Sequence, residues 1–284
     1  MELPLLIIEA DNTDDLPLRF RMASTPHSGE TAGMPDLAGY HELNISGSGQ
    51  FSEKGLRRMR QLIGEGPAII VDLRQECHGF VNGMAVCWFG THNNANKGLS
   101  REQVEEQEAQ RLRGLKEAAE VAFDYLEGKS AEVHLPGPIS SPVTVQSEKE
   151  LAKQEGFLYT RFFVTDHHRP GDDEVDRFIT FVNSQTNEIW LHFHCRGGVG
   201  RTTTFMLMYD MMRNAKRVGL SDILERHRLS GGRDMYRMDP QRDGYKYAPA
   251  VERLAFLQQF YQYCADDQDG FETSWSEWLK RQNS

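Results

Sequence analysis

The sequence lacks a long apolar run and lacks an excess of basic residues. No run approaches the roughly 20 apolar residues that cross a bilayer, so we expect a soluble protein without a membrane span. The 284 residues include 42 acidic and 32 basic ones, for a formal net charge of −10. Proteins that bind nucleic acid or anionic membranes are normally basic overall, so neither is expected as the main partner. An anionic ligand therefore requires a locally basic pocket.

Cysteine is scarce, and its spacing argues against two common roles. The chain has four cysteines, Cys77, Cys87, Cys195 and Cys264. No CxxC pair and no Cys/His spacing typical of a zinc site is present, so neither a metal nor a cofactor is expected. If one cysteine stays a free nucleophile, the other three cannot all pair, which argues against a disulfide scaffold.

The first residues do not resemble an export signal. The segment MELPLLIIEADNTDD has a short apolar run between acidic residues, without the basic start and longer apolar stretch of a secretory signal. The localisation stays open between two alternatives. Either the protein is not exported by that route, or a signal was removed and the protein is secreted or periplasmic.

One segment is distinctive: residues 194–202 (HCRGGVGRT), directly after the apolar run 189–193. Cys195 and Arg201 are separated there by five residues, Arg196, Gly197, Gly198, Val199 and Gly200. The glycines tolerate unusual dihedral angles, so the backbone N–H groups can surround one phosphate. The guanidinium of Arg201 suits two phosphate oxygens. The spacing therefore predicts a phosphate-binding loop.

The same segment predicts a nucleophile. A helix expected over 202–213 would direct its positive end at the Cys195 sulfur, and Arg201 adds a full charge; both favour a thiolate, which can attack phosphorus to give a phosphocysteine. A bare cysteine in an apolar strand is usually a small buried hydrophobe, but the complete pattern favours catalysis. Thr202 can donate its hydroxyl to the sulfur or simply cap the helix, and His194 can orient the loop or serve the fold.

Phosphoryl transfer from an alkoxide-like leaving group also needs a proton donor. Asp166 follows the predicted strand 157–164 and starts the segment TDHHRPGDD, whose proline and glycine mark a loop. A carboxylic acid on such a loop can close over the substrate and protonate the departing oxygen. The alternative is a solvated turn residue beside the caps of the next helix.

Strand and helix patterns alternate along the chain and predict an α/β fold. A mostly parallel central sheet with helices on both faces is expected, in a single domain over 1–284. The expected strands are 5–9, 68–73, 157–164 and 189–193. The expected helices begin at Ser52 as a cap and run to about 63, then 100–128, 173–183, 202–213, 221–229 and 249–264. Residues 132–146 carry three prolines, which suits edge strands; about 1–20 and 130–150 are expected to form a small β subdomain.

Several segments resemble the bacterial protein-tyrosine-phosphatase-like phytases, which are cysteine phosphatases. They are, in chain order, ISGSGQFSEKGL, VDLRQECHGFVNG, TDHHRP, WLHFHCRGGVGRTTTFMLMYDM and FETSWSEWLK. The resemblance implies a phosphatase α/β core with a small partial β-barrel. It also implies stepwise removal of phosphates from myo-inositol hexakisphosphate without a metal.

The resemblance also assigns residues. Cys195 matches the family nucleophile, Arg201 its phosphate-binding arginine and Asp166 its general acid. Further matches would contact substrate: His167, Lys246, Arg253 in place of a second lysine, and Arg21 with Arg19 as its alternative. Arg196 departs from the family, in which the position after the cysteine is often acidic or small; it can add affinity for crowded phosphates or simply face solvent. The loop THNNAN has Asn93 where the family leads us to expect an aspartate.

Three alternatives to a phytase remain. A phosphate-binding pseudo-enzyme is disfavoured because the nucleophile, the arginine and the acid are all present. A protein-tyrosine or phosphoinositide phosphatase would use the same loop, with pocket depth as the discriminating feature. A secreted effector that acts mainly by binding a host protein is the third, and the chain shows no interaction motif for it.

Overall fold

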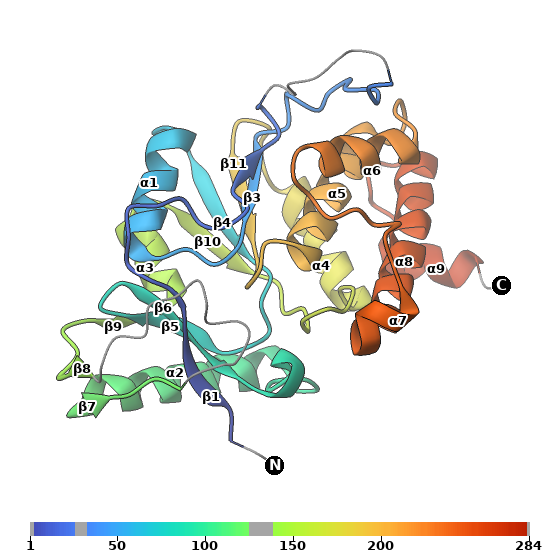
Figure 1. Ribbon diagram of the computed structural model, residues 1–284. Coiled ribbons are helices and arrows are strands. Elements are labelled where there is room, and N and C mark those ends of the chain that lie inside the picture. Colours follow the sequence, from blue (N-terminus) through green and yellow to red (C-terminus); the bar gives the residue numbers. More distant parts are fainter. Residues whose placement is uncertain (1–2, 26–32, 125–138, 283–284) are drawn as a thin grey trace.

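A five-stranded sheet forms the centre of the protein, in a computed structural model that describes residues 3–25, 33–124 and 139–282 (Figure 1). Its strands, in spatial order, are β10 (Leu158–Arg161), β4 (Ala68–Asp72), β11 (Trp190–His194), β3 (Ile45–Ser48) and β2 (Arg21–Met22). The first four run parallel, and β2 pairs antiparallel with β3. Because β11 is the middle strand, the loop that follows it starts at the centre of the carboxyl edge.

Each face of this sheet is covered by a separate core. Side chains alternate along a strand, so Ile69 and Val71 point to one face and Ala68 and Ile70 to the other. The first face packs against helices α4 (Asp172–Asn183) and α5 (Gly200–Asn214). The second packs against α1 (Glu53–Ile63) and α3 (Glu148–Gln154). Helices on both faces were expected from the alternating sequence pattern.

The remaining helices lie beyond these layers. On the side of α5, Figure 1 shows three of them together. They are α6 (Leu220–Leu229), α8 (Tyr247–Asp266) and α9 (Trp275–Gln282), and short turns occur at α7 (Pro240–Asp243), η1 (Thr91–Asn93) and η2 (Gly244–Lys246). Among the described residues, no helix is long and apolar enough to cross a membrane.

Local sequence signals placed two helix starts correctly, while the predicted starts at 173, 202, 221 and 249 lie one or two residues late and α3 and α9 were not predicted. Ser52 caps α1 by accepting a hydrogen bond from the Gly55 N–H, as predicted. Ser100 likewise caps α2 (Arg101–Glu117) through a full capping box. The predicted end of α2 is wrong: the helix stops at Glu117, because residues 120–121 leave it to form strand β7 (Glu120–Val121), and Gly128 lies outside the described residues.

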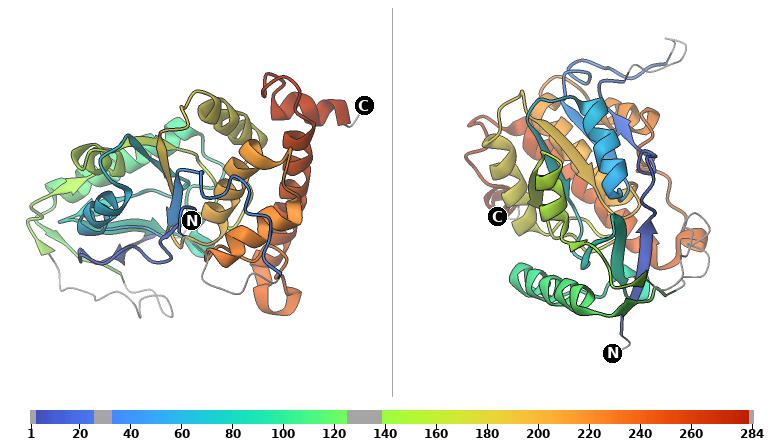
Figure 2. Two further views of the ribbon diagram at one scale, coloured as in Figure 1. Left: turned by 90° about the horizontal axis from the view of Figure 1, so that it is seen from above. Right: turned by 90° about the vertical axis from the view of Figure 1, so that its left-hand side faces the viewer.

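A second, antiparallel sheet lies beside the first. Its order is β1 (Leu5–Ala10), β6 (Met84–Phe89), β5 (His78–Val81) and β9 (Val145–Gln146), and a separate pair joins β7 to β8 (Ile139–Ser140). Helix α2 packs on it through Val104 and Leu112 against Trp88, and lies at the lower edge of the molecule in the right-hand view of Figure 2. The sequence pattern predicts β1 and short strands within 132–146, although 132–138 lie outside the described residues. Strands β5 and β6 were not predicted.

Candidate active site

The loop after β11 is shaped by its glycines. Gly198 has a φ of +70°, and a Cβ there would lie 2.4 Å from the Gly49 nitrogen, so both conformation and space require glycine. Helix α5 begins at Gly200, inside the loop and two residues before the predicted start. Cys195, 3% exposed, is the first residue after the strand, and Thr202 donates its hydroxyl to the Cys195 sulfur across 3.2 Å.

Arg201 closes the loop and is nearly buried, at 2% exposure. Its two terminal nitrogens donate to the Glu76 carboxylate at 2.7 and 2.9 Å, and one of them lies 3.1 Å from Asp166. Burial opposes the charge, but the Asp166 and Glu76 carboxylates outweigh it and raise the pKa of Arg201. Its Nε makes no hydrogen bond to any described residue.

Asp166 lies over this arginine, on the loop after β10. Its carboxylate accepts hydrogen bonds from the His167 backbone N–H at 2.9 Å and from the Asn93 side-chain amide at 2.9 Å. Burial raises the pKa of Asp166, but the Arg201 charge, the His167 ring and the hydrogen bond from Asn93 together outweigh burial, so the pKa lies below its ordinary value. The predicted nucleophile, arginine and acid are thus brought together from two loops at the carboxyl edge of the sheet.

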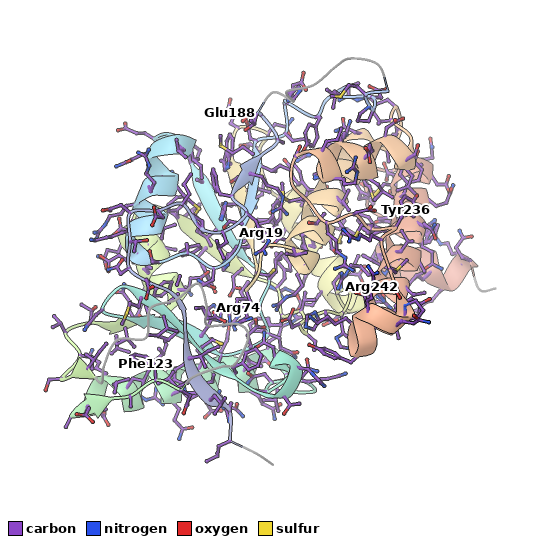
Figure 3. The ribbon with its side chains drawn as sticks, in the orientation of Figure 1. Arg19, Arg74, Phe123, Glu188, Tyr236 and Arg242 are labelled. Carbon is purple, nitrogen blue, oxygen red and sulfur yellow. The ribbon has the colours of Figure 1, made fainter. Side chains whose placement is uncertain are left out.

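Two neighbours of this centre were not among the predicted site residues. Glu76 lies in the segment VDLRQECHGFVNG, and its carboxylate also bonds Arg74 at 2.9 Å and Asn93 at 3.0 Å. Figure 3 shows Arg74 near the middle of the molecule, between the two sheets. The charges of Arg201 and Arg74 outweigh burial and lower the pKa of Glu76. No local pattern marks either residue, because their partners are distant along the chain.

His194 does not act on the loop as expected. Side chains alternate along β11, and that of His194 points to the face of the sheet that α3 covers. There its Nε2 bonds Glu148 at 2.6 Å. Its Nδ1 makes no hydrogen bond to any described residue, so the expected bond to the loop is not made. The side chain therefore belongs to a buried cluster on the far side of the sheet.

That cluster joins two histidines and two carboxylates without exposure to solvent. His78 Nε2 lies 3.3 Å from both Asp72 and Glu148. Burial and nearby arginines lower the pKa of His78, but the surrounding carboxylates, with Asp72 and Glu108 the strongest, together raise it to about 10. Burial raises the pKa of Glu148, and the His194 imidazole brings it down to about 2. Ligand atoms of Asp72, Glu148 and His194 lie within 4.8 Å of one another; His194 bonds Glu148 and lies 3.9 Å from Asp72.

Three predicted substrate-binding cations bond protein groups in this structure. Arg21 donates to the Gly198 carbonyl at 2.9 Å, and the alternative Arg19 donates to the Gly197 carbonyl at 3.0 Å. Arg196 donates to Glu9 at 2.6 Å and lies over the Phe89 ring. These bonds connect Arg21 and Arg19 to the loop after β11, and Arg196 to β1.

Arg253 and Lys246 lie on the other side of the loop. Arg253, 3% exposed, donates to the His167 carbonyl, and burial lowers its pKa to about 10. Lys246 is half-buried, with its ammonium 5.5 Å from the Tyr245 ring centre. The Tyr245 ring meets the edge of His167, whose pKa is lowered to about 4 mainly by burial. Lys246 makes neither an ion pair nor a side-chain hydrogen bond among the described residues, whereas Arg21 and Arg253 donate to backbone carbonyls.

A cysteine at the head of a five-residue loop, an arginine at its end and a strand–loop–helix frame form a site of the cysteine-phosphatase type. Residues 71–213 match the family model of the PTP-like phytases, and the description of that family names inositol hexakisphosphate. The chain belongs to this family of protein-tyrosine-phosphatase-like phytases.

Two solved structures and one effector protein are similar to the chain. A PTP-like phytase from Bdellovibrio bacteriovorus has 30% identity and a TM-score of 0.76, covering 99% of this chain and 96% of that one. A PTP-like myo-inositol phosphatase from Mitsuokella multacida, in complex with myo-inositol-(1,3,4,5)-tetrakisphosphate, has 34% identity and a TM-score of 0.91, covering 98% and 48%. Effector protein hopD2 of Pseudomonas syringae pv. tomato is 30% identical over 265 residues, covering 90% and 54%. The chain thus spans about half the length of the last two.

Proposed function

We propose that this protein removes phosphates stepwise from inositol polyphosphates, with myo-inositol hexakisphosphate as its substrate. The observation that carries this function is the approach of Asp166 to Arg201, 3.1 Å apart over the loop of Cys195. A phosphate held by the loop would lie between the sulfur and the carboxyl, as in-line displacement requires. The relative from Mitsuokella, bound to an inositol tetrakisphosphate, supports the substrate class.

The first step forms a phosphocysteine. The Cys195 thiolate attacks phosphorus, the bond from phosphorus to the inositol oxygen breaks, and Asp166 gives its proton to that oxygen. Arg201 and the backbone N–H groups of the loop stabilise the charge on the phosphoryl oxygens. Glu76 holds the guanidinium in place through two hydrogen bonds, leaving its Nε for the phosphate.

The second step returns the enzyme to its starting state. Water attacks phosphorus, the phosphorus–sulfur bond breaks, and Asp166, now a carboxylate, accepts the proton of that water. The hydroxyl of Thr202, 3.2 Å from the sulfur, stabilises the departing thiolate. In both steps Arg201 and the backbone amides stabilise the negative charge on the phosphoryl oxygens. We therefore propose that the reaction proceeds without a metal or cofactor.

The basic rim supplies the affinity for a crowded polyphosphate in an acidic protein. Lys246 lies beside His167 with no carboxylate to neutralise it among the described residues, which suits a distal phosphate. For Arg21, Arg196 and Arg253, contact with substrate stays a prediction, because each donates to a protein group. The predicted partial β-barrel and the domain division also stay predictions: the second sheet is antiparallel, and its edge strands β1 and β9 are not paired with each other.

A second candidate function is favoured by one observation. The similarity to effector protein hopD2, of which the chain spans 54%, suggests that a chain of this kind can form part of a longer effector. As its substrate in that case we propose a protein phosphotyrosine or a phosphoinositide. The loop chemistry is the same for either substrate. Localisation stays open for the same reason.

The deciding experiment compares substrates. Phosphate release is measured from inositol hexakisphosphate, a phosphotyrosine peptide and a phosphoinositide at equal concentration, with and without EDTA. We expect the highest kcat/KM for the hexakisphosphate and no effect of EDTA. Higher kcat/KM for the peptide would favour the second function, and loss of activity with EDTA that a divalent ion restores would refute the metal-free mechanism.

A further inference from the structure

Four groups above the catalytic loop form a closed ring of hydrogen bonds and ion pairs. Asp166 lies 3.1 Å from Arg201, Arg201 donates to Glu76 at 2.9 Å, Asn93 donates to Glu76 at 3.0 Å, and Asn93 donates to Asp166 at 2.9 Å. Two carboxylates thus alternate with two donors. Among these groups, Asn93 has no role in the mechanism described above.

The orientation of the Asn93 amide follows from its neighbours. Both groups that face its nitrogen are carboxylates, which accept hydrogen bonds and donate none when ionised. The nitrogen must therefore face them, and one NH₂ group serves both. An aspartate has the same shape but only acceptor atoms. At this position it would place a third carboxylate against Glu76 and Asp166, with Arg201 as the cation shared by all three.

The backbone at this site supports a specific function for the side chain. Asn93 is 3% exposed and has a φ of +61°, and its neighbour His92 has a φ of +55°. Two consecutive left-handed residues are uncommon outside glycine and persist where the surroundings fix them. The His92 ring stacks on the ring of Tyr245, the residue before Lys246, with ring centres 3.7 Å apart. This contact joins the segment of Asn93 to the segment of Lys246.

We propose that Asn93 is a positioning residue whose amide holds the Asp166 carboxyl against Arg201 and Glu76. It acts through Asp166, and the inference rests on the proposed function in taking Asp166 as the general acid. Hydrogen bonds donated to a carboxylate favour its charged form. Asn93 therefore fixes both where the acid lies and over which pH range it carries its proton.

The test is the pH profile of kcat/KM for Asn93→Asp, with glycerol 2-phosphate and inositol hexakisphosphate as substrates. The basic limb of kcat/KM reports the acid in the free enzyme. Replacing the donor by a carboxylate should move that limb to higher pH by about one unit, because the free energy of a hydrogen bond to a charged group corresponds to a pKa change of about this size. Asn93→Ala removes the donor without adding charge and should move it less. The ratio of variant to wild-type rates cancels the titration of the substrate itself.

Two controls separate positioning from general damage. Asn94→Asp adds the same charge one residue further on, where the side chain bonds neither carboxylate among the described residues, and it should keep the wild-type limb. In an Asp166→Asn background, Asn93→Asp should cause no further shift. A fall in rate without a shift, an equal shift in Asn94→Asp, or a shift that persists without Asp166 would each overturn the inference. If Asn93→Asp fails to fold, as judged by thermal unfolding, Asn93→Ala decides by the same measurement.

The outcome is separable from the fate of the proposed function. A wild type that cleaves glycerol 2-phosphate but not inositol hexakisphosphate overturns the proposed substrate, and the glycerol 2-phosphate profiles still decide the role of Asn93. A wild type that cleaves neither overturns both, because no acid step would exist for Asn93 to support.

Discussion

The Arg201 guanidinium lies 3.1 Å from the Asp166 carboxylate, so the phosphate-binding cation and the proposed acid are paired within one site. Burial raises the pKa of Asp166, and Arg201 together with His167 and Asn93 brings it below its ordinary value. A phosphate dianion on the loop adds negative charge beside the same carboxylate, which raises a carboxyl pKa. The acid should therefore gain its proton when substrate binds, which is when the leaving oxygen needs it.

Replacing the nucleophile should stop turnover and spare binding. Cys195→Ser should lower kcat on any phosphate monoester to less than about a thousandth of wild type, a barrier increase above ~4 kcal/mol, because serine is a far poorer nucleophile without a base. Inositol hexakisphosphate should still bind, as measured by calorimetry. Cys264→Ser is the matched control, since burial raises the pKa of that thiol well above its usual value and it lies in the core. Retained turnover in Cys195→Ser would contradict the mechanism.

Removing the rim lysine should affect substrates unequally. Lys246→Met should raise KM for inositol hexakisphosphate several-fold more than KM for p-nitrophenyl phosphate, which has no distal phosphate to lose. Lys149→Met removes an exposed lysine on α3, on the opposite face of the sheet, and should change neither value. Equal increases for both substrates would assign Lys246 to the loop or to the fold.

The buried cluster beneath β11 should make stability depend on pH in a defined way. The pKa of Glu148 falls from 4.5 to about 2 on folding, so its contribution is complete above about 4.5 and is lost as pH falls through about 2. The pKa of His78 rises from 6.5 to about 10, so its contribution is complete below about 6.5 and is lost as pH rises through about 10. The two contributions are complete together between about pH 4.5 and 6.5.

Denaturant unfolding at several pH values checks this window. Glu148→Gln leaves His78 and His194 without one carboxylate, and breaking a buried pair costs about 3–5 kcal/mol. The loss should be largest between pH 4.5 and 6.5 and should shrink toward pH 2. Glu65→Gln, which changes an exposed carboxylate, should unfold like wild type at each pH. A pH-independent loss in Glu148→Gln would mean that packing, and not charge, holds the cluster.

Local signals in the sequence predicted the elements that local chemistry decides. Ser52 and Ser100 mark helix starts because a cap bonds within its own first turn. The hairpin of β5 and β6 also has a local signal in the sequence, the Asn-Gly pair at its turn, but the hairpin was not predicted. Asn82 and Gly83 both have positive φ at its turn, as the Asn-Gly pair of a two-residue hairpin does.

The parts that were missed depend on distant partners. Glu76 and Arg201 are 125 residues apart, and Asn93 and Asp166 are 73 apart, so no spacing in one sequence reveals either pair. Arg21 shows the same limit: the family resemblance implied a substrate contact, which stays a prediction, but not the bond to the Gly198 carbonyl, 177 residues away. Residue type predicted the chemistry of the loop, and only the fold showed what supports it.

The last prediction concerns Asp166 as the general acid. Protonating a leaving alkoxide is typically worth 10²–10⁴-fold, so Asp166→Asn should lower kcat on inositol hexakisphosphate by about that factor. The loss should be much smaller for p-nitrophenyl phosphate, because p-nitrophenolate leaves well without a proton. In the wild type, kcat should fall as pH rises through the pKa of the acid, giving an acidic optimum.

The pairing with Arg201 sharpens this expectation. Because phosphate charge raises the pKa of Asp166 in the complex, the basic limb of kcat should lie at higher pH than the limb of kcat/KM, which reports the free enzyme. Both limbs should flatten in Asp166→Asn. Asp173→Asn, on the exposed start of α4, is the matched control and should keep both. If Asp166→Asn loses equal activity on both substrates and keeps its basic limb, the proton comes from another group, and His167 and His168 are the next residues to replace.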